Sequence, residues 1–355
     1  MKHEWKEFLK NSGAEFEEDC VCTFGNPERE RRIAHTGDLF CDLSHFGIIS
    51  AYGEDAAEFL QAQFTNDINQ VDESHSQLSA LCSPKGRMLC NFRIFRREQT
   101  YYLVLPYELL EAALSRLRMF VLRSRVTLED ASDALMGIGA SGTKMIDHLG
   151  DIAGNLPEKV DESIESQGYT IIRVAGVNPR FEIYGLLEPM KKLWQALDVH
   201  ATPVGANVWE LLNIQAGIPV ITAGSIDAYV PQMANMHLIN GVSFSKGCYP
   251  GQEIVARMHY LGKLKRRMYH IGFSAKDKPA AGTALVTESS TESQDIGTIL
   301  SAQQNPDGDY DALAVIQTSD AENSALKLGD AEGPDVRVLD LPYGFDNEEL
   351  KMKNE

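Results

Sequence analysis

The residues best suited to chemistry lie in one segment, 246–253, which reads KGCYPGQE. A short strand is expected just before it at 242–245, and the proline and glycine suit a turn. Residues 252–262 then have apolar side chains at helical spacing and a glycine stop. Cys248 is therefore predicted just ahead of a helix N-terminus and two residues after Lys246. Both features favour the thiolate, the reactive and metal-ligating form of cysteine.

A single cysteine is more often a small buried hydrophobic residue. A core cysteine, however, needs neither a lysine two residues earlier nor a Gly-Gln-Glu helix entry after it, so we interpret Cys248 as functional. The other cysteines form no C-x-x-C pair and no regular ladder, which argues against a zinc site and against a secreted disulfide framework. No metal ligands are predicted. These five cysteines are Cys20, Cys22, Cys41, Cys82 and Cys90.

Segment 246–253 resembles the K-G-C-Y-x-G-Q-E signature of the folate-binding YgfZ family. Members of that family are relatives of the T-protein of glycine cleavage, an aminomethyltransferase. The resemblance extends over most of the chain, from about Gly37 to Tyr343. Its further segments are 42–49, 53–56, 59–63, 65–67, 85–87, 214–219, 231–235 and 341–343.

The order of predicted elements indicates the fold class. Strands and helices mix without regular βαβ alternation, which is typical of α+β proteins. Residues 131–203 follow a β-α-β-β-α order that resembles a ferredoxin-like module. Short strands after Met268 suggest a small barrel or sandwich.

The resemblance implies a three-domain, T-protein-like ring around a central folate site. We expect a discontinuous folate-binding α+β domain at 1–130 plus 204–262 and a ferredoxin-like domain at 131–203. A C-terminal β-barrel domain is expected at 263–345, followed by a charged tail at 346–355.

The function implied by the resemblance is that of an accessory protein. Such a protein would bind tetrahydrofolate, or a one-carbon derivative of it, and support the assembly or repair of four-iron iron–sulfur enzymes, with a link to tRNA modification. Its partners would be folate and iron–sulfur client enzymes or cluster carriers. Cys248 would act as a nucleophile, redox thiol or transient cluster ligand, with Lys246 and Asp67 as the other candidate catalytic residues. The candidate cofactor-binding residues are Phe46, Trp209, Gln215, Gln232, Tyr249, Gln252, Glu253 and Arg257.

Two departures from the relatives bear on the activity. The transferase carries paired aspartates for its one-carbon chemistry, and no such pair occurs around residues 85–90. We therefore expect no classical turnover. Gln215 stands where the family has glutamate, and loss of that charge would cost about 1–2 kcal/mol, or about tenfold in folate affinity. The alternative is a tetrahydrofolate-dependent aminomethyl- or methyltransferase with Asp67 as its acid.

Composition limits the partners further. The net charge of −18 argues against direct binding of nucleic acid or of an anionic membrane. The N-terminus lacks the apolar core of a signal peptide, so a cytoplasmic protein is expected. Residues 137–142 match G-x-G-x-x-G, which leaves a nucleotide-binding oxidoreductase as a third hypothesis.

Two basic clusters stand out in this acidic chain. Each is either a solvated face or a seat for an anionic tail or partner. The first consists of Arg257, Lys263, Lys265, Arg266, Arg267 and Lys276, and the second of Arg116, Arg118, Arg123 and Arg125.

Overall fold

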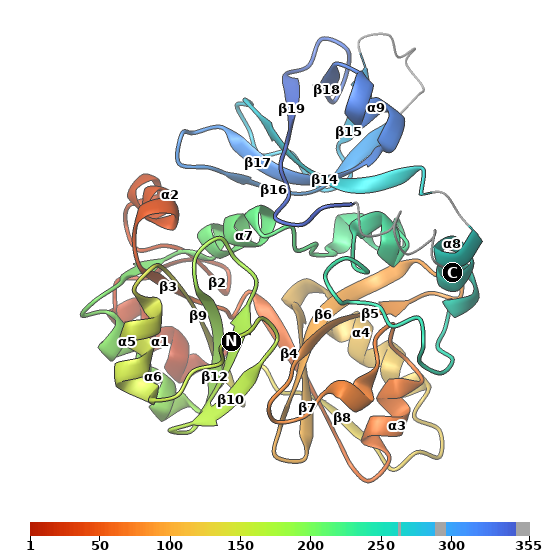
Figure 1. Cartoon of the computed structure of the whole chain (residues 1–355). Coiled ribbons are helices and arrows are strands. Elements are labelled where there is room, and N and C mark those ends of the chain that lie inside the picture. The colour runs from red at the N-terminus through yellow and green to blue at the C-terminus, as the bar shows by residue number, and fades with distance from the viewer. Residues whose placement is uncertain (262–263, 288–295, 346–355) are drawn as a thin grey trace. The chain divides into compact units, whose positions relative to one another are not determined.

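The computed structural model describes residues 1–261, 264–287 and 296–345 (Figure 1). Gly262, Lys263 and the tail at 346–355, which were assigned roles above, lie outside these residues. The chain forms two compact units. The first consists of Met1–Gln61, Ile68–Gln77 and Phe92–Leu212, and the second of Ala62–Asp67, Leu78–Asn91 and the chain from Asn213 onward. The three domain boundaries predicted from the sequence stay predictions.

A six-stranded sheet organises the first unit, in the order β10-β11-β12-β9-β3-β13. Only β13 runs parallel to its neighbour; the other pairs are antiparallel. The predicted β-α-β-β-α order is extended by β10, which precedes β11, and by β13, which follows the last helix. Strand β3 from the N-terminal part of the chain is inserted between β9 and β13. The strands are β3 (Leu39–Asp42), β9 (Met136–Ser141), β10 (Ser163–Ser166), β11 (Tyr169–Val174), β12 (Arg180–Gly185) and β13 (Thr202–Val204).

Helices cover this sheet because each has one apolar stripe to bury. Buried side chains of α1 (His3–Asn11), α5 (Met145–Ala153) and α6 (Leu187–Leu197) share one core cluster with residues of β3, β9, β11 and β12. A second cluster holds Val208 and Trp209 of α7 (Ala206–Gln215) with other residues of β3, β11 and β12. A short hairpin and one more helix precede β3, and none of the three was predicted: β1 (Glu15–Glu17), β2 (Cys20–Thr23) and α2 (Pro27–Thr36).

The first unit also contains four strands in the order β6-β7-β4-β8. Helix α4 (Tyr107–Met119) packs on β4, β7 and β8, while α3 (Ala56–Gln61) buries Ala56, Phe59 and Leu60. The strands are β4 (Phe46–Tyr52), β6 (Met88–Arg97), β7 (Thr100–Pro106) and β8 (Thr127–Asp130). Residues 88–91 of β6 belong to the second unit, together with residues 78–82 of its neighbour β5 (Gln77–Cys82).

A closed barrel forms the C-terminal part of the second unit, with strand order β14-β17-β16-β15-β18-β19. The predicted barrel is therefore confirmed and the sandwich excluded. Apolar side chains from all six strands share one core inside the barrel. The strands are β14 (Arg266–Phe273), β15 (Ala284–Thr287), β16 (Gly297–Gln304), β17 (Tyr310–Gln317), β18 (Leu326–Leu328) and β19 (Asp335–Leu339), with the short helix α9 (Thr318–Asn323) after β17.

The G-x-G-x-x-G segment is not a nucleotide loop. Residues 137–141 lie within β9, and a Cβ on Gly139 would come within 2.8 Å of the Trp209 ring. The glycine is thus required for packing of an aromatic ring against the sheet rather than for approach of a phosphate. The prediction of a phosphate-binding loop at 137–142 was wrong, and the nucleotide-binding oxidoreductase hypothesis loses the motif on which it was based.

An ion-pair network is buried within the first unit. Arg93 of β6 donates to the Asp161 carboxylate at 2.6 Å, and its Nε lies 3.5 Å from the Glu182 carboxylate. The Ser76 hydroxyl accepts a further hydrogen bond from Arg93. These contacts join residues far apart in the chain, so the network holds the unit together.

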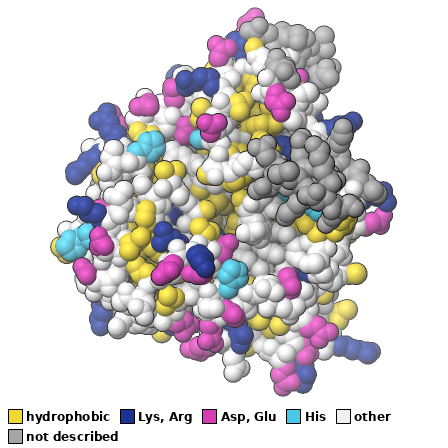
Figure 2. All heavy atoms as spheres, in the orientation of Figure 1, with side chains coloured by type: hydrophobic (Ala, Val, Ile, Leu, Met, Phe, Trp, Pro, Cys, Tyr) yellow, Lys and Arg dark blue, Asp and Glu magenta, His cyan; other side chains and the backbone are white. Residues whose placement is uncertain are grey.

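The surface carries charges of both signs. Figure 2 shows acidic and basic side chains interspersed over one face. Among the residues that the structure describes, no helix is both long enough and apolar enough to span a membrane.

Candidate functional site

Cys248 lies in an irregular loop that leads into α8 (Gln252–Leu261). The predicted helix is confirmed, whereas the strand predicted at 242–245 is absent from this described stretch. Two exposed residues of the loop, Gly247 and Cys248, lie between the buried residues Lys246 and Tyr249. The thiol is therefore presented to solvent between two anchored residues.

The side chain of Lys246 is buried within the second unit, to which this residue belongs. Its ammonium donates to the backbone carbonyls of Phe64 at 2.6 Å and Asn66 at 2.9 Å. It also lies 5.3 Å from the centroid of the Tyr249 ring. Lys246 thus fixes the backbone on one side of Cys248, a role that the sequence did not suggest. The predicted effect of its charge on the thiol stays a prediction.

Burial affects the charge of Lys246. It lowers the pKa of the ammonium to about 8 from 10.5, and the nearby Asp67 carboxylate partly opposes this. Between these two values the unfolded chain binds more protons than the folded one, so stability rises with pH. We expect Lys246→Met to remove this rise, whose slope stays below about 1.4 kcal/mol per pH unit. Urea unfolding at a series of pH values from neutral to alkaline checks this, and parallel curves for the two proteins would contradict it.

The other side of the loop is fixed by two glycines. Gly251 has φ of +83°, and a Cβ there would lie 2.5 Å from the Ser83 carbonyl oxygen. A Cβ on Gly86 would lie 2.9 Å from Cβ of Ile254 in α8. The turn at 83–87 therefore packs closely against the start of α8, which requires glycine on both partners.

Several predicted cofactor-binding residues bind the protein itself. The Gln232 amide donates to the Val255 carbonyl of α8 at 2.6 Å, and the Gln252 amide donates to the Lys246 carbonyl at 3.4 Å. An ion pair of 2.7 Å joins the exposed side chains of Glu253 and Arg257, one helical turn apart. These contacts support the loop and α8, and cofactor contact by these residues stays a prediction.

Gln215 is held by a network that the sequence did not reveal. Its amide donates to the Asp311 carboxylate of β17 at 3.2 Å. Asn305 donates to the same carboxylate at 3.0 Å, and Nε2 of His270 lies 3.6 Å from it. Burial pushes the pKa of Asp311 upward, but these hydrogen bonds outweigh burial and leave the pKa below its usual value. Asp311 is therefore an anion at neutral pH, and it needs a donor such as Gln215 beside it.

Trp209 does not present a stacking surface. The ring is fully buried, and the Arg180 guanidinium lies over it at 3.8 Å from the centroid. Arg180 also donates to the Trp209 carbonyl at 3.2 Å, and Gly139 lies against the ring. The expectation that this ring contacts a pterin is corrected here: in the structure it is a core residue.

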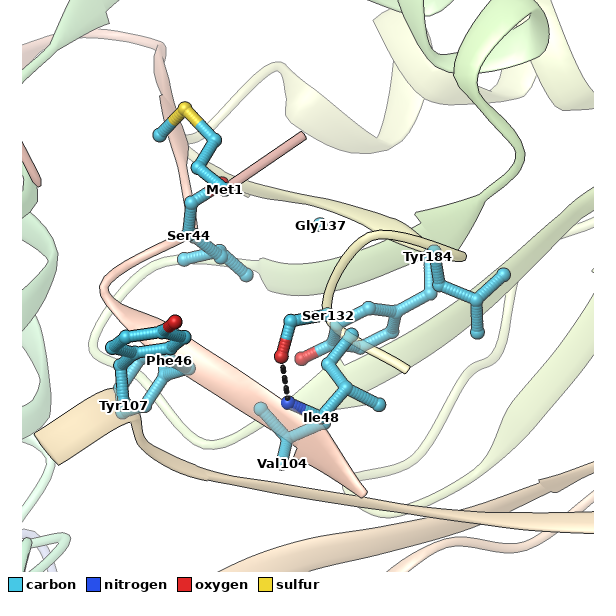
Figure 3. Close-up of a pocket in the computed structure, with 11 residues that line it drawn as sticks. Met1, Ser44, Phe46, Ile48, Val104, Tyr107, Ser132, Gly137 and Tyr184 are labelled. Atoms are coloured by element: carbon cyan, nitrogen blue, oxygen red, sulfur yellow. Dashed lines mark hydrogen bonds between the residues drawn. The ribbon is translucent and has the colours of Figure 1, made fainter. Parts of the chain in front are cut away.

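Phe46 is half-buried and lines a small pocket in the first unit (Figure 3). Leu43, Tyr107 and Tyr184 also line this pocket, and the Ser132 hydroxyl accepts from the backbone N–H of Ile48 at 3.0 Å. The cavity volume of about 10 Å³ has room for one water molecule. A pterin ring does not fit this pocket as it stands.

Known proteins match the chain over most of its length. The GCVT N-terminal domain matches residues 14–241. The tRNA-modifying protein YgfZ of Yersinia pestis is 32% identical over 303 residues, which cover 85% of this chain and 92% of the relative. Its counterpart from Colwellia psychrerythraea is 31% identical, with the same coverage of both chains. This chain belongs to the YgfZ family.

The fold of this YgfZ family member matches that of an aminomethyltransferase. The glycine cleavage system aminomethyltransferase T from Bartonella henselae superposes with a TM-score of 0.76. It covers 96% of this chain and 97% of the other at 18% identity. At that identity the match shows the fold alone, so the predicted T-protein-like fold is confirmed and the activity is left open.

Proposed function

We propose that this protein is a tetrahydrofolate-binding accessory factor that supports iron–sulfur enzymes through the Cys248 thiol. The observation that carries the proposal is an exposed thiol on a loop whose two flanks are fixed, by Lys246 on one side and by Gly251 on the other. A catalytic or ligand-exchanging sulfur must be accessible and held in one place. The relatives named above are tRNA-modifying proteins, so iron–sulfur enzymes that modify tRNA are the clients we propose.

Cys248→Ala tests the role of the thiol. The variant and the native protein are expressed in bacteria that lack their own YgfZ, and the activity of a four-iron tRNA-modifying enzyme is measured. We expect the variant to give no more activity than the empty strain. Its unfolding free energy should change by less than about 0.5 kcal/mol, because the side chain is exposed. Cys22→Ala, a half-buried cysteine of the other unit, is the control and should rescue fully. Full rescue by Cys248→Ala would refute the proposed role.

Folate binding is the second part of the proposal. It rests on membership of the family and on Phe46 and Gln215, both half-buried and partly accessible. Tetrahydrofolate is titrated into the protein and the heat of binding is measured. We expect Phe46→Ala and Gln215→Ala each to weaken binding by about tenfold, whereas Trp209→Phe should bind nearly as the native protein does. Absence of binding by the native protein would remove folate from the proposal.

The transferase alternative depends on Asp67. This half-buried carboxylate interacts with the Lys246 ammonium, which places it among the supports of the loop. Assay of the purified protein with tetrahydrofolate and a one-carbon donor separates the two functions. Sustained turnover that Asp67→Asn abolishes would favour the transferase.

A further inference from the structure

Large apolar side chains are exposed together at the end of α4. Met119 is 65% exposed, Phe120 41% and Leu122 89%. The other large apolar side chains exposed in the described residues are spread singly along the sequence. Single exposed apolar residues are ordinary, but a group of them marks an interaction surface. We refer to residues 116–125 as the α4 tip.

The α4 tip is also positively charged. Of its four arginines, Arg125 is the one that pairs with carboxylates among the described residues, and its partners are Glu54 and Asp55. Arg118 donates to the Leu128 backbone carbonyl at 2.8 Å, and this neutral partner does not compensate the charge of the guanidinium. Arg116 lies over the Phe120 ring at 5.6 Å from its centroid, and the exposed Arg123 has no carboxylate partner in the part of the chain described. Three arginines without a carboxylate partner among the described residues thus flank the apolar group in the sequence, in a protein of net charge −18.

The backbone of the α4 tip is strained at Leu122, a residue that is almost fully exposed to solvent. Leu122 has a φ of +42°, which lies in the left-handed region. Residues other than glycine rarely adopt this region, and bulky residues adopt it least. A turn alone would be better served by glycine or asparagine, which tolerate this conformation. A leucine that is both strained and almost fully exposed contributes nothing evident to the fold.

We propose that the α4 tip is a docking surface for an acidic segment of a partner protein that places apolar side chains among Met119, Phe120 and Leu122. The positive charge of the α4 tip favours a partner that carries carboxylates. The apolar side chains of the tip favour a partner that also carries apolar side chains between those carboxylates. Arginine, methionine and phenylalanine are enriched in protein interfaces relative to the rest of the protein surface.

Other anionic partners fit the α4 tip less well. An RNA backbone would pair with the arginines but would leave the aliphatic Met119 and Leu122 without contacts. An anionic membrane would attract the tip but repel the rest of this acidic protein. A protein segment satisfies both the charges and the apolar group.

A defined probe tests the proposal with the full chain. The probe is a short fluorescein-labelled peptide in which leucines are interspersed among glutamates, and its anisotropy is followed as protein is added. We expect binding that weakens as salt rises. Leu122→Gly and Arg123→Glu should each weaken it by about tenfold or more. Because glycine relieves the backbone strain, Leu122→Gly should fold at least as stably as the native protein, so the loss cannot be attributed to unfolding.

The controls separate docking from general charge attraction. Val177→Asp removes an apolar side chain of similar exposure elsewhere in the first unit and should leave binding unchanged. A peptide with serine in place of leucine should bind much more weakly. The proposal is overturned if the serine peptide binds equally well, or if Leu122→Gly and Arg123→Glu bind like the native protein. It is also overturned if only phosphatidylserine vesicles or bulk tRNA show a dependence on Leu122 and Arg123.

Discussion

Gln215→Glu is expected to destabilise the protein by about 2–4 kcal/mol at pH 7. The reason is that Asp311 is buried, anionic and only 3.2 Å from the Gln215 amide. The substitution replaces a donor with a second carboxylate, and two like charges at this distance repel strongly where water is largely excluded. Urea unfolding measures the loss. A variant as stable as the native protein at pH 7 would show that the Gln215–Asp311 contact is unimportant.

The pH dependence of Gln215→Glu has a definite sign. Repulsion raises the pKa of one of the paired carboxyls in the folded state, so the folded variant takes up a proton before the unfolded chain does. The destabilisation should therefore shrink as the pH falls toward 5. Adding Asp311→Asn should restore most of the stability at pH 7, because an asparagine amide can donate to the new carboxylate. The double variant also carries the glutamate of the family, so its folate affinity tests whether that charge matters.

Arg93→Ala is expected to cost about 3–5 kcal/mol in unfolding free energy. It removes the cation that is buried between Asp161 and Glu182 and leaves both carboxylates without their charge partner in the core of the first unit. Chemical unfolding followed by circular dichroism measures the change. Adding Asp161→Asn should recover part of the loss, because one of the two stranded charges is then removed.

Arg32→Ala is the matched control for this prediction. It also removes one arginine–carboxylate pair, that with Glu28 at 2.6 Å, but both side chains are about two-thirds exposed. Exposed pairs of this kind contribute about 0.5 kcal/mol or less. If the two variants lost similar stability, burial of the Arg93 network would not be what makes it important.

Local sequence patterns correctly predicted the features that depend on neighbouring residues. The apolar spacing after Gln252 predicted α8, and the short strands after Met268 predicted the barrel. Both predictions were possible because the periodicity of a helix or strand depends on side chains that are close together in the sequence. The strand expected at 242–245 is irregular instead. Its Lys246 end is tied to backbone carbonyls at Phe64 and Asn66, and tertiary contacts of this kind override local propensity.

Glycines show where local pattern was insufficient. Three glycines at 137–142 matched a phosphate-binding spacing, but β9 needs Gly139 because the Trp209 ring lies against it. The sequence held no signal for this contact, since the two residues are far apart in the chain. The sequence likewise held no signal for the contact between the Trp209 ring and the Arg180 guanidinium that lies over it.

The sequence by itself determined the family and the position of the exposed thiol, because the signature around Cys248 is contiguous and its turn and helix form locally. Only the tertiary structure decided what holds that thiol in place. The carbonyls that bind Lys246 come from residues 182 and 180 positions away, and the carboxylate that binds Gln215 lies 96 positions along the chain. Hydrogen bonds between such distant groups exist only once the chain has folded, so no local spacing could have predicted them.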